Sequence, residues 1–120
     1  VIIITNQACV GKSIITKKTL NLIHNKMQKY LKSKNNAHVD DIFFSPYYKY
    51  SNNNEYKNNI FDRKPNPGML IKAIKKWNID KKKSFFIGDS LTDHDAAEKI
   101  KIKFYYKDKI NLFNQLKEIL

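Results

Sequence analysis

The hexapeptide GDSLTD, residues 88–93, places two carboxylates directly after an apolar run. Gly88 lets the backbone turn sharply, so that Asp89 projects from the end of an expected strand. Asp93 follows four residues later, at the start of an expected helix. Carboxylate oxygens suit a hard cation, and we predict that Asp89 and Asp93 bind Mg²⁺. Taken alone, the pattern also fits Asp89 as a helix cap and Asp93 as a carboxylate that favours the helix dipole.

Two further segments offer a cation and a hydroxyl group. Lys64 stands in RKPNPGM, residues 63–69, where two prolines restrict the backbone. An ammonium group held in this way can be aimed at a phosphate as a point charge. Thr5 ends the apolar run VIIIT. Its hydroxyl can donate to a phosphate oxygen, and we expect the backbone amides of Asn6 and Gln7 to be free to do the same.

Strands and helices that could position these groups alternate along the chain. Strands are expected at 1–5, 39–45, 84–88 and 102–105, and helices at 17–33, from Pro67 onward, at 93–99 and at 111–120. Thr16 and Asn66 are the expected caps of the first two helices. Such alternation predicts an α/β fold with a parallel sheet covered by helices on both faces. Ligands in such folds bind beyond the carboxyl ends of the strands, where all three polar segments fall.

Apolar stripes on the helices indicate which faces are buried. The first helix is expected to bury one stripe, made of Leu20, Ile23, Met27, Tyr30 and Leu31. The second is expected to turn four residues inward, Leu70, Ala73, Ile74 and Trp77. Residues 46–62 are rich in Asn and Tyr, show no period and are expected to form a long surface loop.

The tripeptide Gly11-Lys12-Ser13 raises the question of a nucleotide-binding P-loop. That motif requires a second glycine five positions before Gly11, and the residue there is Asn6. Without the first glycine, the loop cannot easily fold its amides around a phosphate. The chemistry is therefore expected from Thr5-Asn6-Gln7 and from the later segments.

Size and charge restrict the class of protein. The chain has 120 residues, enough for one domain, and a formal net charge of +12. Its lysines are spread between apolar helix positions, as on a solvated face, so a nucleic-acid partner is not expected, whereas an anionic small substrate gains from the same field. No apolar run approaches the roughly 18 residues of a membrane helix. One cysteine and no secretory signal pattern are consistent with the cytoplasm.

In order and spacing, strand-terminal Thr5, Lys64 and the 88–93 hexapeptide resemble motifs two, three and four of the haloacid dehalogenase superfamily of phosphohydrolases. The resemblance covers the whole chain and implies a three-layer Rossmann-like core in residues 1–120. TNQ, RKPNPGM and GDSLTDHDAA are similar to the branch that contains heptose bisphosphate and histidinol-phosphate phosphatases. A sugar bisphosphate, such as the heptose used in outer-membrane saccharide synthesis, is the implied substrate.

The resemblance also implies a role for each charged group at the reacting phosphate. Thr5 and Asn6 would bind the transferring phosphoryl group, and Lys64 would offset its charge. Asp89 would ligate Mg²⁺, with Asp93 as a second ligand or just behind the first. Catalysis would thus rest on positioning and charge neutralisation.

Four residues are expected to bind the substrate rather than to act on it. They are Asn6, Gln7, Lys12 and Arg63. Arg63 would contact the other phosphate or the sugar, where a planar fork is useful. Lys12 stands where the family usually has a basic residue after glycine.

Two departures from the family pattern stand out. The family's nucleophile lies in a D-x-D motif on an earlier strand, and Asp40-Asp41 cannot replace it because they begin a strand. We therefore expect a core that is incomplete at its N-terminus and a nucleophile encoded before Val1. Many members of the branch also hold a structural zinc through Cys and His. The matching positions, Ser45, Tyr47, Ile60 and Asp62, offer neither, so no zinc is expected.

Two other functions stay open at this point. A nucleic-acid 3′-phosphatase of the same superfamily has similar TNQ and KPxxGM motifs, and the charge supports it, although the second aspartate of the hexapeptide argues against it. A remnant that lacks the nucleophile could serve only as a binding domain. For the sugar-bisphosphate phosphatase, a monomer is expected.

Overall fold

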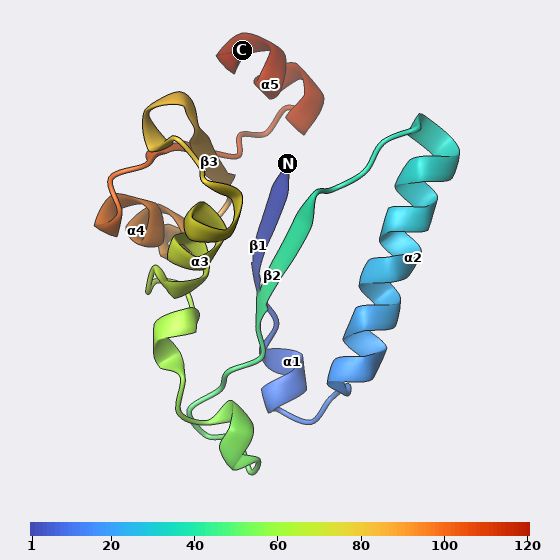
Figure 1. Cartoon of the computed structure of the whole chain (residues 1–120), viewed down its shortest axis with the longest axis vertical. Helices are drawn as coiled ribbons and strands as arrows, with labels where there is room; N and C mark the ends of the chain where they lie inside the picture. Colours follow the sequence, from blue (N-terminus) through green and yellow to red (C-terminus); the bar gives the residue numbers. More distant parts are fainter. The chain divides into compact units, whose positions relative to one another are not determined.

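Strands and helices alternate along residues 1–120, all of which are described by a computed structural model (Figure 1). The chain divides into two compact units, Val1–Arg63 and Lys64–Leu120, and each is described by itself. Each unit holds one two-stranded parallel sheet. The predicted α/β class with parallel strands is confirmed. The assignment of residues 1–120 to a single domain stays a prediction.

The sheet of the first unit pairs β1 (Ile2–Asn6) with β2 (Asp41–Ser45). The register runs from Ile2 opposite Asp41 to Asn6 opposite Ser45. Branched residues fill most of β1, as is typical of strands that lie within a sheet. Because the strands are parallel, Thr5 and Asn6 lie at their shared carboxyl end.

A short helix lies between β1 and the long helix that follows, in a segment where no helix was expected. This helix, α1, spans Ala8–Gly11. Gly11 packs so closely on the next loop that a Cβ there would lie 2.3 Å from the carbonyl oxygen of Pro46. The helix is therefore fixed by contact with residues 46–48, and only glycine allows this approach.

The long helix α2 spans Lys17–Asn35, two residues beyond its expected end. Thr16 caps it as predicted, because its hydroxyl accepts a hydrogen bond of 3.1 Å from the amide of Thr19. The predicted stripe is wrong in part, since Ile23 is 52% and Tyr30 61% exposed.

Polar contacts explain the rotation of this stripe. The His24 ring lies 5.7 Å from the Phe44 ring, and the Gln28 side chain exchanges two hydrogen bonds with the backbone of Val39. These contacts turn positions 24 and 28 toward β2 together with Leu20, which is buried. The apolar pattern could not reveal them because both residues are polar.

The segment at 46–62 contains two short 3₁₀ turns, Asn54–Tyr56 and Ile60–Asp62. The amide of Tyr48 donates to the carbonyl of Tyr56 at 2.8 Å, which closes the segment on itself. Ser51 and Asp62 are buried. This is an ordered excursion, not a structureless loop.

The sheet of the second unit pairs β3 (Phe85–Gly88) with β4 (Lys103–Tyr106). Cross-strand rings support it, with the Phe85 and Tyr105 centroids 5.5 Å apart. Helices α3 (Gly68–Trp77), α4 (Leu91–Lys99) and α5 (Leu112–Ile119) and the 3₁₀ turn η3 (Lys81–Lys83) complete the unit. No helix of the chain combines the length and the apolar character needed to cross a bilayer.

Two expectations for α3 are wrong. Pro67, not Asn66, occupies the N-cap position, and no side chain caps the helix. The Asn66 side chain instead accepts a bond of 3.4 Å from Lys99. Leu70 and Ala73 are buried as expected, but Trp77 is 44% exposed. The helix ends at Trp77, and the next residue, Asn78, adopts a left-handed conformation.

Candidate active site

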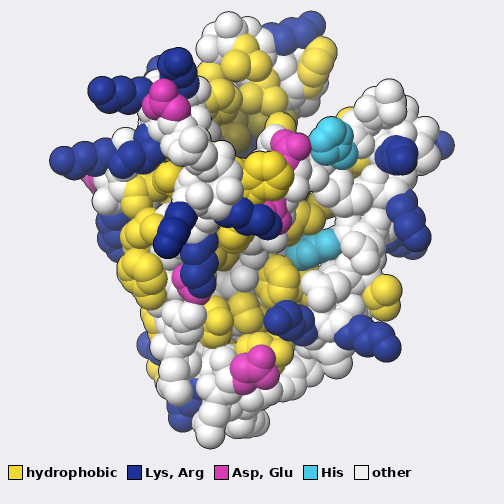
Figure 2. Space-filling view, viewed as in Figure 1, with side chains coloured by type: hydrophobic (Ala, Val, Ile, Leu, Met, Phe, Trp, Pro, Cys, Tyr) yellow, Lys and Arg dark blue, Asp and Glu magenta, His cyan; other side chains and the backbone are white.

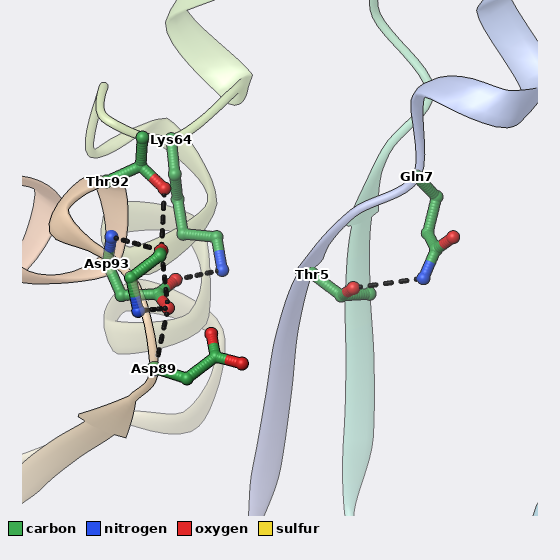
Figure 3. A network of polar contacts seen from close by, with 7 residues as sticks. Thr5, Gln7, Lys64, Asp89, Thr92 and Asp93 are labelled. Atoms are coloured by element: carbon green, nitrogen blue, oxygen red, sulfur yellow. Dashed lines mark hydrogen bonds and ion pairs between the residues drawn. The ribbon is translucent and has the colours of Figure 1, made fainter. Parts of the chain in front are cut away.

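Asp93 is the centre of a polar network at the carboxyl end of β3 (Figure 3). Its Oδ2 atom accepts hydrogen bonds from the amides of Asp89 and Ser90, both at 3.2 Å, and from the Ser90 hydroxyl at 2.9 Å. Its Oδ1 atom accepts a short charged hydrogen bond from the Lys64 ammonium group. Both oxygens are therefore engaged within the protein.

Lys64 and Asp93 form a buried ion pair, with their side chains only 10% and 7% exposed. The Lys64 ammonium group also lies 5.7 Å from the centroid of the Phe86 ring. A buried pair is held tightly because neither charge can separate without being left unpaired in a low-dielectric environment. The pair thus connects the RKPNPGM segment to the first turn of α4 and fixes where the cation points.

Burial alone would raise the pKa of Asp93, but the hydrogen bonds from Lys64 and Ser90 outweigh it and hold the pKa below its ordinary value. The group is therefore a carboxylate at neutral pH. A metal ion would have to compete with Lys64 for its oxygens.

Ser90 is the residue that sequence reasoning missed. It is the N-cap of α4, and with Asp93 it forms a capping box in which each side chain bonds the backbone of the other. The sequence pattern Ser-x-x-Asp at the start of a helix is the feature that could have predicted this capping box. The alternative in which Asp89 is the cap is wrong, because Ser90 takes that position.

Gly88 is required by close packing. A Cβ at this position would lie 2.6 Å from both the Cβ and the Oδ2 atom of Asp93. The glycine before Asp89 therefore makes room for the carboxylate that holds Lys64, in addition to allowing the strand to turn.

Asp89 differs from Asp93 because the Asp89 side chain is exposed and its carboxylate makes no hydrogen bond or ion pair (Figure 3). Its amide is fixed by Asp93, so the start of the side chain is held while the carboxylate stays available. Mg²⁺ commonly uses one or two carboxylates and fills its remaining positions with water and phosphate oxygens. The donor set at Asp89 fits this ion, and Asp93 fits the task of holding Lys64.

In the first unit, Thr5 is positioned by its own neighbour. The side-chain amide of Gln7 donates a hydrogen bond of 3.0 Å to the Thr5 hydroxyl oxygen (Figure 3). Since that oxygen is already an acceptor, its proton remains available to a ligand. Gln7 thus supports the predicted role of Thr5 as a donor.

The backbone amides of this region are less available than expected. The Gln7 amide donates to the carbonyl of Ser45 at 2.8 Å and is not free for phosphate, contrary to the prediction. The amides of Lys12 and Ser13 donate to Ala8 and Val10 at 2.8 and 3.0 Å. The tripeptide at 11–13 therefore ends a helix and cannot act as a P-loop cradle.

The two cations of the first unit that were predicted to bind substrate are both held by residues 47–48. The Lys12 ammonium group lies 5.1 Å from the centroid of the Tyr48 ring, and Arg63 donates to the carbonyl of Tyr47 at 3.4 Å. The prediction that Thr5 and Lys64 meet at one sheet edge stays a prediction, because they belong to separately described units.

A family model described as haloacid dehalogenase-like hydrolase matches residues 53–107. A D-glycero-beta-D-manno-heptose-1,7-bisphosphate 7-phosphatase of Rhodopseudomonas palustris is 35% identical over 98 residues, which are 82% of this chain and 54% of that protein. A D-glycero-alpha-D-manno-heptose-1,7-bisphosphate 7-phosphatase of Photorhabdus laumondii is 36% identical, with the same shares covered. The chain thus spans about half the length of the curated relatives it matches.

Solved structures give the same picture of the fold. The D,D-heptose 1,7-bisphosphate phosphatase of B. bronchiseptica, complexed with magnesium and phosphate, matches with a TM-score of 0.77 and 27% identity. The match covers 98% of this chain and 61% of that one. A HAD-like phosphatase of Mesorhizobium loti, 24% identical, has the same TM-score over 84% of this chain and 48% of its own, which shows the fold alone.

Proposed function

We propose that this chain belongs to the haloacid dehalogenase-like hydrolases and is part of a Mg²⁺-dependent phosphatase that removes one phosphate from a sugar bisphosphate. Relatives named as heptose-1,7-bisphosphate 7-phosphatases support a substrate of that kind. The observation that carries the proposal is that the two aspartates at the end of β3 are in different environments. Asp93 holds Lys64 in a buried pair, while Asp89 keeps an unpartnered carboxylate.

Lys64 and Thr5 are the proposed catalytic residues of this chain. The Lys64 ammonium group offsets the negative charge that gathers on the phosphoryl oxygens, and Asp93 prevents it from turning away. The Thr5 hydroxyl donates to one of those oxygens, with Asn6 beside it, and Gln7 fixes its orientation. Bound at Asp89, Mg²⁺ would polarise a phosphoryl oxygen and neutralise charge.

The reaction itself needs a nucleophile, which we expect to be an aspartate in a segment before Val1. The phosphoryl group would leave the sugar oxygen for this carboxylate and then pass to water, which releases phosphate. Lys12 and Arg63, held by the 47–48 segment, would bind the phosphate that is not removed.

Location, assembly and metal content are further parts of the proposal. A phosphorylated sugar is a cytoplasmic metabolite, and the single cysteine is consistent with a reducing compartment. We propose a cytoplasmic monomer without zinc. Fractionation, size-exclusion chromatography with light scattering and metal analysis of the full-length protein test these three points.

The proposed activity is tested by assaying the full-length protein with Mg²⁺ against three substrates. These are heptose 1,7-bisphosphate, histidinol phosphate and a 3′-phosphorylated oligonucleotide. The first should show the highest kcat/KM. A preference for the oligonucleotide that falls steeply with salt would favour a nucleic-acid phosphatase instead. No turnover of any phosphate ester would favour a binding domain.

A further inference from the structure

A pocket of about 400 Å³ lies between α3, η3 and the carboxyl end of α4, within the second unit. Three isoleucines, Ile71, Ile74 and Ile100, form its apolar part. Four lysines, Lys75, Lys81, Lys99 and Lys101, surround them. We propose that this pocket is a second ligand site, which takes a small organic dianion with an aliphatic body.

The four lysines carry charge that no carboxylate compensates. None of them forms an ion pair within the chain, and no acidic residue lines the pocket. Of the acidic residues beside them in sequence, Asp80 accepts a hydrogen bond from the amide of Lys82, and Glu98 lines a neighbouring pocket that Lys101 also lines. Lys and Arg side chains are spread over the face seen in Figure 2, and four lysines line this one pocket. Such a concentration attracts an anion.

Two of the lysines are held in place by backbone oxygens. The Lys81 ammonium group donates to the carbonyl of Ile100 at 3.0 Å, and that of Lys99 donates to the carbonyl of Pro65 at 3.0 Å. Lys99 also donates to the side-chain oxygen of Asn66 at 3.4 Å. Because an ammonium group has three donors, Lys81 keeps two for a ligand and Lys99 keeps one. Fixing the cations beforehand lowers the ordering cost of binding.

The apolar lining of the pocket favours an aliphatic ligand body. Its volume lies within the range of small-molecule sites. No aromatic side chain lines it, so it offers no surface on which nucleic-acid bases could stack. An aliphatic chain with two negative charges matches both the isoleucines and the lysine rim.

Hexylmalonate is a suitable probe, because it has two carboxylates, a six-carbon chain and no phosphate. It is titrated without Mg²⁺ into full-length protein with labelled isoleucine methyl groups and followed by NMR. We expect shifts at Ile71, Ile74 and Ile100, and binding about tenfold tighter than that of malonate, because the chain buries apolar surface. Equal affinity for malonate, or shifts confined to residues around Lys64 and Asp89, would overturn the proposal.

Matched variants separate this site from a general effect of charge. The double variant Lys75→Gln, Lys101→Gln removes two cations that make no hydrogen bond, so the fold should persist, and hexylmalonate binding should weaken about fivefold or more. The control, Lys17→Gln with Lys18→Gln at the start of α2, removes the same charge and should bind as the unmodified protein does. Equal weakening in both would show that net charge alone attracts the probe and would refute the pocket.

Discussion

The polar groups at the ends of β1 and β3 are held in different ways. At β1, Thr5 is oriented by one neutral hydrogen bond from Gln7, and the surrounding side chains are half-buried. At β3, Lys64 is fixed by a buried ion pair that a helix cap completes. The neutral Thr5 hydroxyl needs only a hydrogen bond to orient it. The Lys64 ammonium group is charged and buried, so it needs a carboxylate to compensate its charge. The difference predicts where substitutions cost stability and where they cost only activity.

The largest expected effect comes from breaking the buried pair. Lys64→Met or Asp93→Asn should each lower the free energy of unfolding by about 3–5 kcal/mol, since each leaves an uncompensated buried charge. The double variant should lose much less than the sum, which a double-mutant cycle by urea unfolding measures. Thr5→Val is the matched change at β1 and should stay within about 1 kcal/mol. Additive losses for Lys64 and Asp93 would contradict the pairing.

The same pair should make stability depend on pH. The pKa of Asp93 is lower in the folded protein than in the unfolded chain, where an aspartate titrates near 3.9. Its contribution is thus fully present above about pH 4 and is lost as the pH falls through the lower folded value. The stability gap between the unmodified protein and Asp93→Asn should therefore shrink below about pH 4. A gap that stays constant down to pH 2 would rule out this linkage.

Asp89→Asn should separate activity from stability. Its side chain is exposed and unpartnered, so the unfolding free energy should change by less than about 0.5 kcal/mol. Turnover should fall about 10²- to 10³-fold, because a carboxylate that would hold the metal is lost. Glu98→Gln, an exposed acid on α4, is the control and should leave kcat unchanged. Full activity in Asp89→Asn would show that Asp89 is not part of the catalytic site.

Gly11 and Gly88 are both tightly packed, one in each unit, and they allow the two regions to be compared by the same substitution. Gly88→Ala and Gly11→Ala each force a Cβ into contact, on Asp93 and on Pro46, and each should cost about 1–3 kcal/mol. Gly88→Ala displaces the partner of Lys64 and should lower kcat. Gly11→Ala shifts the loop that holds Lys12 and should mainly raise KM. The opposite assignment of kcat and KM effects would contradict the proposed roles.

The smallest effect is expected at Gln7. Gln7→Leu removes the donor that orients Thr5 and should lower kcat/KM about three- to tenfold, close to the net value of one hydrogen bond. Because the Gln7 amide still bonds Ser45, stability should hardly change. A loss of kcat/KM well above about tenfold would indicate that Gln7 itself contacts the substrate.

Much of this fold follows from local patterns. The strands, the Thr16 cap and the four main helices were predictable because apolar periodicity and capping chemistry act over a few residues. The inward face of α2 was not predictable, because the contacts that turn His24 and Gln28 inward come from Phe44 in β2 and from Val39, two residues before β2. Polar positions carry no signal of burial until their partners are known.

The candidate site shows the same limit. The residue types of Asp89, Asp93 and Lys64 and their places at strand ends were predictable from the sequence. The pairing of Lys64 with Asp93 was not, because it joins residues 29 positions apart. The engagement of the Gln7 amide by Ser45 likewise depends on the strand register. These contacts favour the role in which Asp93 lies just behind the metal and positions Lys64, and its part in binding Mg²⁺ stays a prediction.

Mg²⁺ binding tests this division of roles most directly. Isothermal titration of the full-length protein with Mg²⁺, in the presence of inorganic phosphate, is compared for the unmodified protein, Asp89→Asn and Asp93→Asn, each first checked by circular dichroism. We predict that Asp89→Asn weakens Mg²⁺ binding at least tenfold, while Asp93→Asn stays within about threefold of the unmodified protein. Loss of Mg²⁺ binding in folded Asp93→Asn, with binding retained in Asp89→Asn, would contradict the account.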